Sequence, residues 1–347
     1  MKRLLLLLLP IGTFAQIPKY YEGIEFRKEN KELQTDLADL VTASHKNVIR
    51  YTPGVWNVLL ESDLDPNDAN KVLLIYGYDD NLGQQYHRTR KKEDRNTGGC
   101  GNCYGRWERE HVFPKSLANP KLDESSPGSG TDAHNLRAVD RQMNSWRSNN
   151  PYRDGSGNAN LSNNGFYPGD EWIGDIARIL MYMNIRYKSQ CDPNNVVINS
   201  TNTISKEIPD LLLKWNAIDP PSEFEKVRNE IISETQGNRN PFIDNPYIAT
   251  ITWGGPTAVN SWNGYLSTDD FTTKEKISVD VYPNPTSDVV KINANSFIKA
   301  NVYNLNGQLI YSSDQKEINL ASYPNGIYII AVHLENGAIE TRKIIKK

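Results

Sequence analysis

The chain has 347 residues, of which 38% are hydrophobic and 23% are charged. This composition excludes a chain that is disordered over most of its length, and the length favours two domains. The formal net charge of −3 excludes a strongly basic protein. Between Arg88 and Arg153, however, 13 Lys and Arg stand against 8 Asp and Glu, a local excess of +5. Such an excess can attract a polyanion, although a solvated surface would show the same count.

The first fifteen residues have the layout of a secretory signal peptide. Lys2-Arg3 precede the apolar run Leu4–Leu9, and Ala15 provides a small residue for cleavage before Gln16. The apolar run is too short to span a bilayer. We therefore expect residues 1–15 to direct export, and the mature chain to have no transmembrane segment.

Residues 16–265 are predicted to form one mainly helical domain with short strands. From Lys31 to Val41 the apolar residues recur at helical spacing, and Asp140 stands where it can cap a helix. In chain order, we predict helices within 17–60, a strand over Val72–Tyr78, a surface loop over Asn81–Asn102, a strand over Arg106–Pro114, a loop over Ala118–Thr131, a strand over His134–Val139, and helices over Asp140–Asn149 and Glu171–Tyr187.

The three cysteines leave at least one thiol unpaired. Cys100-x-x-Cys103 supplies only two of the four ligands that a tetrahedral zinc site needs, so a structural disulfide or plain thiols are favoured over zinc. Cys191 could pair with either of the other two, and the sequence does not choose between them.

The C-terminal part of the chain has a different composition. Residues 266–276 are polar and are predicted to be a linker. Residues 277–347 contain several short apolar runs, with Asn306-Gly307 and Asn336-Gly337 as hairpin signals. These runs predict a small β-sandwich.

The chemistry is concentrated in the segment from Trp107 to Pro114. Hydrolysis of a phosphodiester needs a base for water, a cation, and positive groups that hold the backbone. Glu110 and His111 supply a carboxylate next to an imidazole. Adjacent side chains of a regular strand point to opposite faces, so we expect a distorted strand end before Pro114 that lets both residues share one site.

An ordered set of motifs continues this segment downstream. The set consists of Glu110-His111-Val112-Phe113-Pro114, Asp132-x-His134-Asn135-Leu136 and Asn144-x-x-Arg147-x-Asn149, with Asp65-Pro66-Asn67, Leu74-Ile75-Tyr76 and Gly174–Arg178 outside the central region. It resembles the bacterial endonuclease I family of exported, non-specific nucleases with a ββα-metal (His-Me) finger. The resemblance covers roughly residues 18–255.

The resemblance implies a role for each of three residues. His111 would be the general base that activates the attacking water, while Glu110 and Asn144 would be the protein ligands of one Mg²⁺-type ion. Two oxygen ligands with several waters suit Mg²⁺, and Mn²⁺ and Ca²⁺ are alternatives. The products would carry 5′-phosphates.

Other side chains have open roles. Some relatives have a phosphate-binding arginine in the loop between the two strands, whereas residues 118–131 contain only Lys121 as a base. We take Arg147 as the catalytic candidate, with Arg137 as a second one and a plain surface ion pair as the alternative for each. Arg109 has no role beyond flanking the site, and His134 is expected to be structural. Trp107, Trp146 and Trp172 could stack on bases, but core packing is preferred.

The end of the chain carries its own motifs, namely Tyr282-Pro283-Asn284-Pro285, Leu305-Asn306-Gly307-Gln308, Pro324–Tyr328 and the terminal Lys343–Lys347. They resemble the type IX secretion sorting domain of Bacteroidetes bacteria.

The sequence therefore predicts an α+β chain, with a mainly helical nuclease domain followed by an immunoglobulin-like β-sandwich. We expect a secreted or cell-surface, metal-dependent, monomeric endonuclease that binds DNA, and RNA as a further substrate, through the phosphate backbone. The partner for export would be the type IX machinery. The alternatives are a secreted ribonuclease and an inactive nucleic-acid-binding surface protein.

Overall fold

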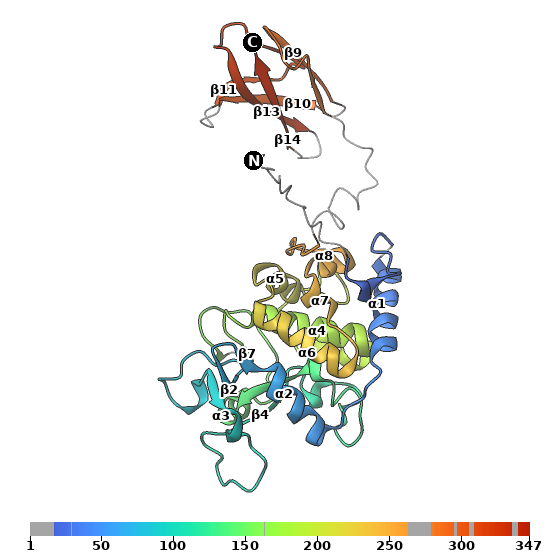
Figure 1. Cartoon of the computed structure of the whole chain (residues 1–347), viewed down its shortest axis with the longest axis vertical. Coiled ribbons are helices and arrows are strands. Elements are labelled where there is room, and N and C mark those ends of the chain that lie inside the picture. The colour runs from blue at the N-terminus through green and yellow to red at the C-terminus, as the bar shows by residue number, and fades with distance from the viewer. Residues whose placement is uncertain are drawn as a thin grey trace, which may run out of the picture. The chain divides into compact units, whose positions relative to one another are not determined.

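The computed structural model describes residues 17–28, 30–162, 164–262, 279–294, 297–304, 309–334 and 339–347 (Figure 1). The chain divides into two compact units, Met1–Phe271 and Thr272–Lys347. The predicted signal peptide, the whole predicted linker 266–276 and both Asn-Gly turns lie outside the described residues.

The first unit is built around one buried helix, α4 (Ile173–Tyr187), in which 12 of the 15 residues are buried. Its sequence is apolar nearly all round, and such a helix is stable only when neighbours cover every face. Helix α4 contacts α1, α5 and α7. The helices of this unit are α1 (Asn30–Ser44), α2 (Trp56–Ser62), α3 (Arg141–Arg147), α4, α5 (Asp210–Ile218), α6 (Glu223–Gln236), α7 (Pro241–Asp244) and α8 (Tyr247–Trp253).

Short antiparallel strands lie at one end of this unit, beside α2 and α3 (Figure 1). They form a three-stranded sheet of β1 (Leu64–Asp65), β2 (Asp68–Leu73) and β3 (Thr89–Lys91), a hairpin of β4 (Trp107–His111) and β5 (Leu136–Asp140), and a hairpin of β6 (Asn160–Ser162) and β7 (Gly165–Tyr167). A parallel bridge between Ile75 and Val139 joins the segment after β2 to β5.

The predicted elements around the motifs are present, with shifted ends. Asp140 caps α3 as expected, because its carboxylate accepts from the backbone N–H of Gln142 and Met143. The strand predicted over Val72–Tyr78 was misplaced: the ladder ends at Leu73, and Tyr76 has a positive φ of 69° that a strand does not tolerate. The predicted loop Asn81–Asn102 contains β3, whose three residues show no apolar alternation.

Buried ion pairs fix β5 to the helices. The guanidinium of Arg137 contacts Asp63 at 3.2 Å and Asp175 at 2.9 Å. Arg228 of α6 contacts the other oxygen of Asp63 at 2.8 Å, and Arg178 of α4 pairs with Glu225. Removing one member would leave a buried charge uncompensated, so this network holds the hairpin rigidly against the helices.

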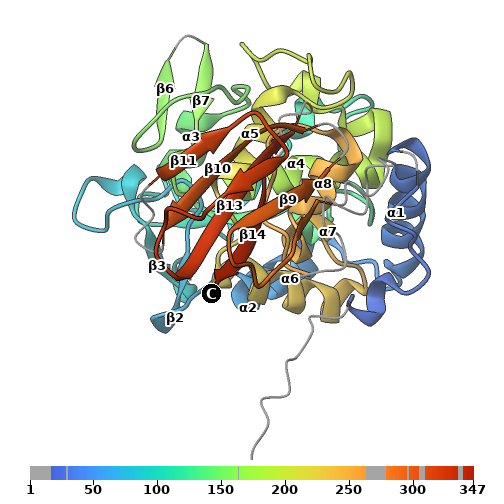
Figure 2. The same ribbon diagram turned by 90° about the horizontal axis from the view of Figure 1, so that it is seen from above.

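The second unit is all-β. One sheet has the order β11-β10-β13-β14 and the other β12-β9-β8, and buried residues of both sheets, among them Val290, Ile318 and Ile330, belong to one core. Figure 2 shows β10, β13 and β14 side by side. The strands are β8 (Asp280–Tyr282), β9 (Val289–Asn293), β10 (Phe297–Asn304), β11 (Leu309–Ser313), β12 (Glu317–Asn319), β13 (Gly326–Leu334) and β14 (Ile339–Lys346).

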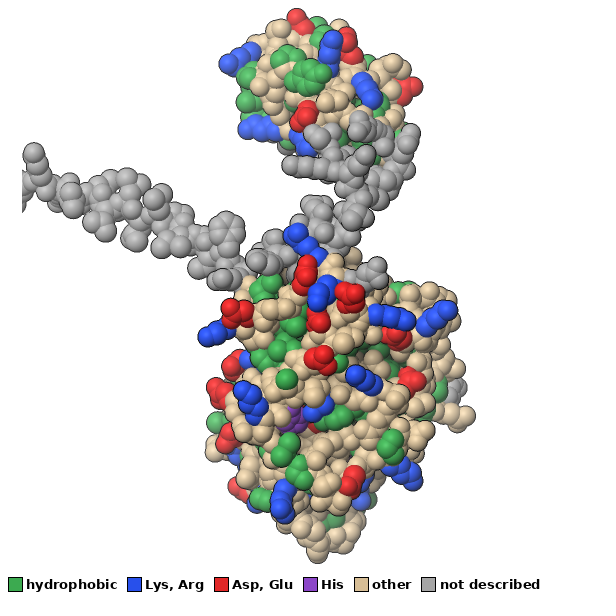
Figure 3. Space-filling model, turned by 90° about the vertical axis from the view of Figure 1, so that its right-hand side faces the viewer, with side chains coloured by type: hydrophobic (Ala, Val, Ile, Leu, Met, Phe, Trp, Pro, Cys, Tyr) green, Lys and Arg blue, Asp and Glu red, His purple; other side chains and the backbone are tan. Residues whose placement is uncertain are grey.

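The chain thus has helices and sheets of the α+β kind, followed by an all-β region. None of the described helices has the length and apolar character needed to cross a bilayer. On the face shown in Figure 3, basic and acidic side chains of the first unit are intermixed, in keeping with its modest net charge.

Candidate active site

The hairpin of β4 and β5 sets the geometry of the candidate site. The two strands pair residue by residue from Trp107↔Asp140 to His111↔Leu136 without a bulge. Side chains alternate along such a strand, so Glu108 and Glu110 point to one face while Arg109 and His111 point to the other. The contacts of these residues agree: Glu108 and Glu110 meet α3, whereas Arg109 and His111 meet Tyr51.

Glu110 is a buried carboxylate with two neighbours. Tyr76 donates a hydrogen bond to its Oε1 at 3.0 Å, and Nη1 of Arg147 lies 3.4 Å from the same oxygen. Burial raises the pKa of Glu110 to about 7 even though Arg147 and Tyr76 oppose the shift. Both of these contacts use Oε1, so the second oxygen, Oε2, is available to a cation.

Asn144 lies on the same side, in the middle of α3. Its Nδ2 donates to Oε1 of Glu108 at 2.6 Å. The other oxygen of Glu108 accepts from Asn96 at 3.1 Å and lies 3.2 Å from Nε of Arg141. The amide nitrogen of Asn144 is therefore directed at Glu108, and its carbonyl oxygen is the atom left for a cation.

These residues have the donor set of a hard cation. Glu110 and Asn144 offer one carboxylate and one amide oxygen, and Glu108 adds a second carboxylate close enough to raise the pKa of Glu110 further. The described residues contain no group of three or more His, Cys, Asp or Glu arranged for a metal. An ion here would consequently rely on few protein ligands and keep water or substrate oxygens, which is the habit of Mg²⁺.

His111 occupies the opposite face of β4. Its Nε2 lies 2.8 Å from the carbonyl oxygen of Gly130, and its ring stacks on Tyr51 with 5.7 Å between centroids. Burial lowers the pKa of His111 to about 4, against the opposing effects of the Gly130 carbonyl and Glu124. Since a carbonyl only accepts, Nε2 must carry the proton, and Nδ1 is the basic nitrogen.

The loop between the strands encloses His111. Oε1 of Glu124 lies 3.7 Å from Nδ1 of His111, and Lys115 holds the other carboxylate oxygen at 2.6 Å. A Cβ added to Gly130 would lie 2.0 Å from the carbonyl oxygen of Asp123. Only glycine lets the loop fold back this closely, and the fold-back brings Glu124 and the Gly130 carbonyl to the same imidazole.

One structural expectation was wrong. The strand end before Pro114 was expected to be distorted so that Glu110 and His111 share one face, yet the ladder is regular through His111. The two residues flank the strand from opposite sides, and a substrate that uses both must lie across its edge. Interstrand pairing up to Leu136 explains the regularity, because Val112 continues it by donating to the Asn135 carbonyl.

Both arginine candidates are buried, whereas an arginine that binds the substrate phosphate must be open to solvent. Arg137 is fully buried in the ion-pair network, and Arg147 is 1% exposed. Besides Glu110, Arg147 donates to the carbonyls of Val112 and Ser148. A partly exposed cation on the His111 face is Arg109, which packs over the rings of Tyr51 at 3.5 Å and Trp56 at 4.3 Å.

The remaining candidates belong to the framework. His134 is 1% exposed, and its Nε2 lies 3.1 Å from the carbonyl oxygen of Asn238. Trp107 and Trp172 are buried, and Trp146 packs partly against the core. Cys100 and Cys103 form a disulfide, and Cys191 is a buried thiol.

Sequence reasoning missed several members of the site. Glu108 could have been found, because it stands two residues before Glu110 on a predicted strand and must share its face. Tyr76 belongs to the motif Leu74-Ile75-Tyr76 of the resemblance, but Tyr76, Tyr51 and Glu124 have no periodic relation to β4, so no spacing in the sequence places them against Glu110 or His111.

Comparison with known proteins adds two family matches. Residues 29–247 match the family described as Endonuclease I, and residues 280–347 match the one described as Secretion system C-terminal sorting domain.

Individual relatives agree with these matches. The chain is 36% identical over 262 residues to an extracellular ribonuclease of Bacillus subtilis (strain 168), covering 72% of this chain and 83% of the relative. An extracellular ribonuclease of Bacillus amyloliquefaciens is 38% identical over 255 residues, or 70% of this chain and 81% of that protein. A β-agarase D of Zobellia galactanivorans is 34% identical over 67 residues, only 19% of this chain and 14% of the agarase.

Proposed function

The chain belongs to the endonuclease I family and is a secreted nuclease with a type IX sorting domain, and from this premise we propose that it is a metal-dependent, non-specific endonuclease whose base is His111. In this proposal β4, β5 and α3 are the ββα-metal finger, and the C-terminal unit is the immunoglobulin-like sandwich. Residues 1–15 act as the signal peptide that precedes type IX export.

The observation that carries the proposal is that the two faces of β4 hold different groups. One face presents Glu110 and Glu108, with Asn144 of α3 bonded to Glu108, and the other presents His111, whose Nε2 lies against the Gly130 carbonyl. A phosphodiester lying across the strand edge would meet a cation site on one side and a base on the other. This arrangement supplies two of the three requirements for phosphodiester hydrolysis.

His111 performs the proton transfer in this proposal. The bond to the Gly130 carbonyl keeps the proton on Nε2, so the lone pair of Nδ1 is free to take a proton from a water molecule. The oxygen of that water then attacks phosphorus, and the bond from phosphorus to the 3′ oxygen breaks. Stacking on Tyr51 holds the ring plane in place during the transfer.

Glu110 and Asn144 would hold the cation, which supplies Lewis-acid stabilisation of negative charge on the phosphate and leaving oxygen. Tyr76 and Arg147 orient the Glu110 carboxylate through Oε1. We assign Arg147 this positioning role instead of phosphate binding, because its guanidinium is buried. Arg109, half-buried on the His111 face, is the better candidate for the substrate phosphate.

The substrate is a nucleic-acid backbone, with DNA as the first candidate. RNA is a second candidate for a specific reason: both Bacillus relatives are named extracellular ribonucleases. Contacts to phosphate do not distinguish the two polymers, so one site could cut both.

A digestion series tests the proposal. The mature protein is incubated with double-stranded DNA, single-stranded DNA and RNA, each with Mg²⁺, Mn²⁺, Ca²⁺ or EDTA. We expect cleavage with a divalent ion, 5′-phosphate ends, and no cleavage in EDTA. Glu110→Gln should need a higher metal concentration for half-maximal rate, while Glu61→Gln on α2 serves as a matched control away from the site. Cleavage that continues unchanged in EDTA would overturn the proposal.

A further inference from the structure

One aromatic side chain of the first unit stands apart from all the others. Tyr104 is 60% exposed, whereas every other Phe, Tyr and Trp within the described residues 17–262 is buried or half-buried. An exposed aromatic ring keeps a large apolar face in water, and that face is available to stack on a planar ligand such as a base.

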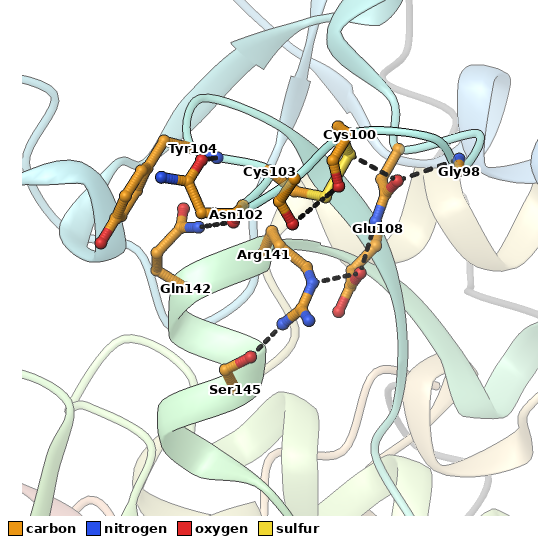
Figure 4. Close-up of a disulfide and its surroundings, with 11 residues drawn as sticks. Gly98, Cys100, Asn102, Cys103, Tyr104, Glu108, Arg141, Gln142 and Ser145 are labelled. Carbon is orange, nitrogen blue, oxygen red and sulfur yellow. Dashed lines mark hydrogen bonds and ion pairs between the residues drawn. A yellow bond between two sulfur atoms is a disulfide. The ribbon is translucent and has the colours of Figure 1, made fainter.

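The loop that carries Tyr104 is held in a fixed shape. The disulfide between Cys100 and Cys103 closes it, and Gly98, Gly99 and Gly105 adopt positive φ values that bend it tightly. Nε2 of Gln142 donates to the carbonyl of Asn102 at 3.1 Å, which ties the loop to α3. Figure 4 shows the Tyr104 ring pointing away from both the disulfide and the helix.

Two positive side chains stand beside this loop. Arg106 and Arg141 are each about one-third to one-half exposed, and the backbone N–H of Arg141 donates to the carbonyl of Arg106 at 3.0 Å. Arg141 contacts Glu108, whose other oxygen accepts from Asn144. The loop is therefore linked to the cation side of the site through Arg141 and Glu108.

We propose that Tyr104 binds the substrate by stacking its ring on an unpaired base, with Arg106 and Arg141 attracting the adjoining phosphates. This inference rests on the proposed nuclease function and specifies its substrate: a strand with accessible base faces, either single-stranded DNA or a single-stranded region of RNA. A ring on a base is tolerant of sequence, because every base has an aromatic face. The loop therefore favours unpaired strands without reading their sequence.

The first experiment compares variants on two substrates. Tyr104→Ala should lower kcat/KM for a single-stranded oligonucleotide roughly 5- to 150-fold, the range expected for loss of one stacked base, mainly through KM. Tyr104→Phe, which keeps the ring, should retain the wild-type value. Leu82→Ala, at a side chain of similar exposure in another loop, is the matched control and should change nothing. Duplex DNA of the same sequence should respond much less to Tyr104→Ala.

A second experiment separates stacking from other contacts. Single abasic positions are placed along the labelled single strand, and binding is measured by anisotropy in EDTA, where no cleavage occurs. At one position the abasic site should weaken wild-type binding and leave Tyr104→Ala binding unchanged. Equal binding by wild type and Tyr104→Ala to the intact strand would overturn the inference. Failure of the wild type to cleave any nucleic acid would instead overturn the proposed function, and the two results are distinguishable.

Discussion

His111 and His134 are two buried histidines whose side chains have similar surroundings. In each, Nε2 faces a backbone carbonyl, that of Gly130 at 2.8 Å and that of Asn238 at 3.1 Å. Burial lowers the pKa of both imidazoles to about 4. Anchoring of one nitrogen and a lowered pKa therefore do not distinguish a catalytic histidine from a structural one.

The difference lies at the second nitrogen. Nδ1 of His111, the last residue of β4, faces the part-exposed carboxylate of Glu124 at 3.7 Å, and His111 itself is 8% exposed. Nδ1 of His134 is buried without a hydrogen-bond partner among the described residues, and the ring packs on Tyr182 with 4.5 Å between centroids. A buried imidazole can therefore meet a substrate only if its Nδ1, the nitrogen not bonded to a backbone carbonyl, faces a place that the substrate can reach.

Removing each imidazole ring in turn tests most directly whether His111 is catalytic and His134 is structural. His111→Ala should lower kcat by about 10²- to 10⁴-fold, the usual contribution of a positioned general base, when it is assayed well below the thermal midpoint of the variant. Activity is measured on plasmid DNA with Mg²⁺, and the midpoint by circular dichroism. His87→Ala, at a partly exposed histidine paired with Asp80, is the matched control and should keep its activity. Full activity in His111→Ala would remove the base from the proposal.

A change that leaves the His111 ring in place should have a smaller effect. Gly130→Ala forces a Cβ to within 2.0 Å of the Asp123 carbonyl, so the loop must move and the carbonyl that anchors Nε2 moves with it. We expect kcat to fall about 10-fold to 100-fold, as for other losses of supporting contacts. Gly128→Ala, where an added Cβ meets nothing within 4 Å, is the control in the same loop. Wild-type kcat in Gly130→Ala would show that the anchor is unimportant.

His134→Ala should show the opposite pattern. The variant loses the contact with Tyr182 and the bond to the Asn238 carbonyl, and leaves a cavity beside the buried carboxylate of Asp132. The free energy of unfolding should fall by about 2 to 3 kcal/mol, while kcat of the folded protein stays within about twofold of wild type. Urea unfolding and initial rates below the transition measure the two quantities. Loss of kcat at unchanged stability would reverse the assignment of His134.

The sequence predicted the strand and helix that carry the site better than the loop that surrounds His111. Asp140 as a helix cap, the strand at Glu110 and the helix with Asn144 follow from local patterns, and the structure contains all three. Glu124 and Gly130 reach His111 through a loop whose path depends on a close backbone approach to Asp123. Such approaches have no period in the sequence, so they appear only in three dimensions.

The smallest expected effect concerns the pH dependence of stability near His134. Its ring is surrounded by Asp132 on its own turn, His45 after α1, and Arg228 of α6. Burial holds the pKa of His134 near 4, below the ordinary value of 6.5, so the unfolded chain binds this proton more readily than the folded one. Stability contributed by the neutral ring is complete above pH 6.5 and is lost as the pH falls towards 4.

The wild type should therefore lose its advantage over His134→Ala in acid. Between pH 7 and pH 5 the difference in unfolding free energy should shrink by about 2 kcal/mol, since each unit of pKa difference is worth about 1.4 kcal/mol. Taking the difference between the two proteins cancels the titration of other buried groups, such as Glu110. A gap that stays constant from pH 7 to pH 5 would mean that His134 is not held neutral, and that the resemblance between the two buried histidines is only geometric.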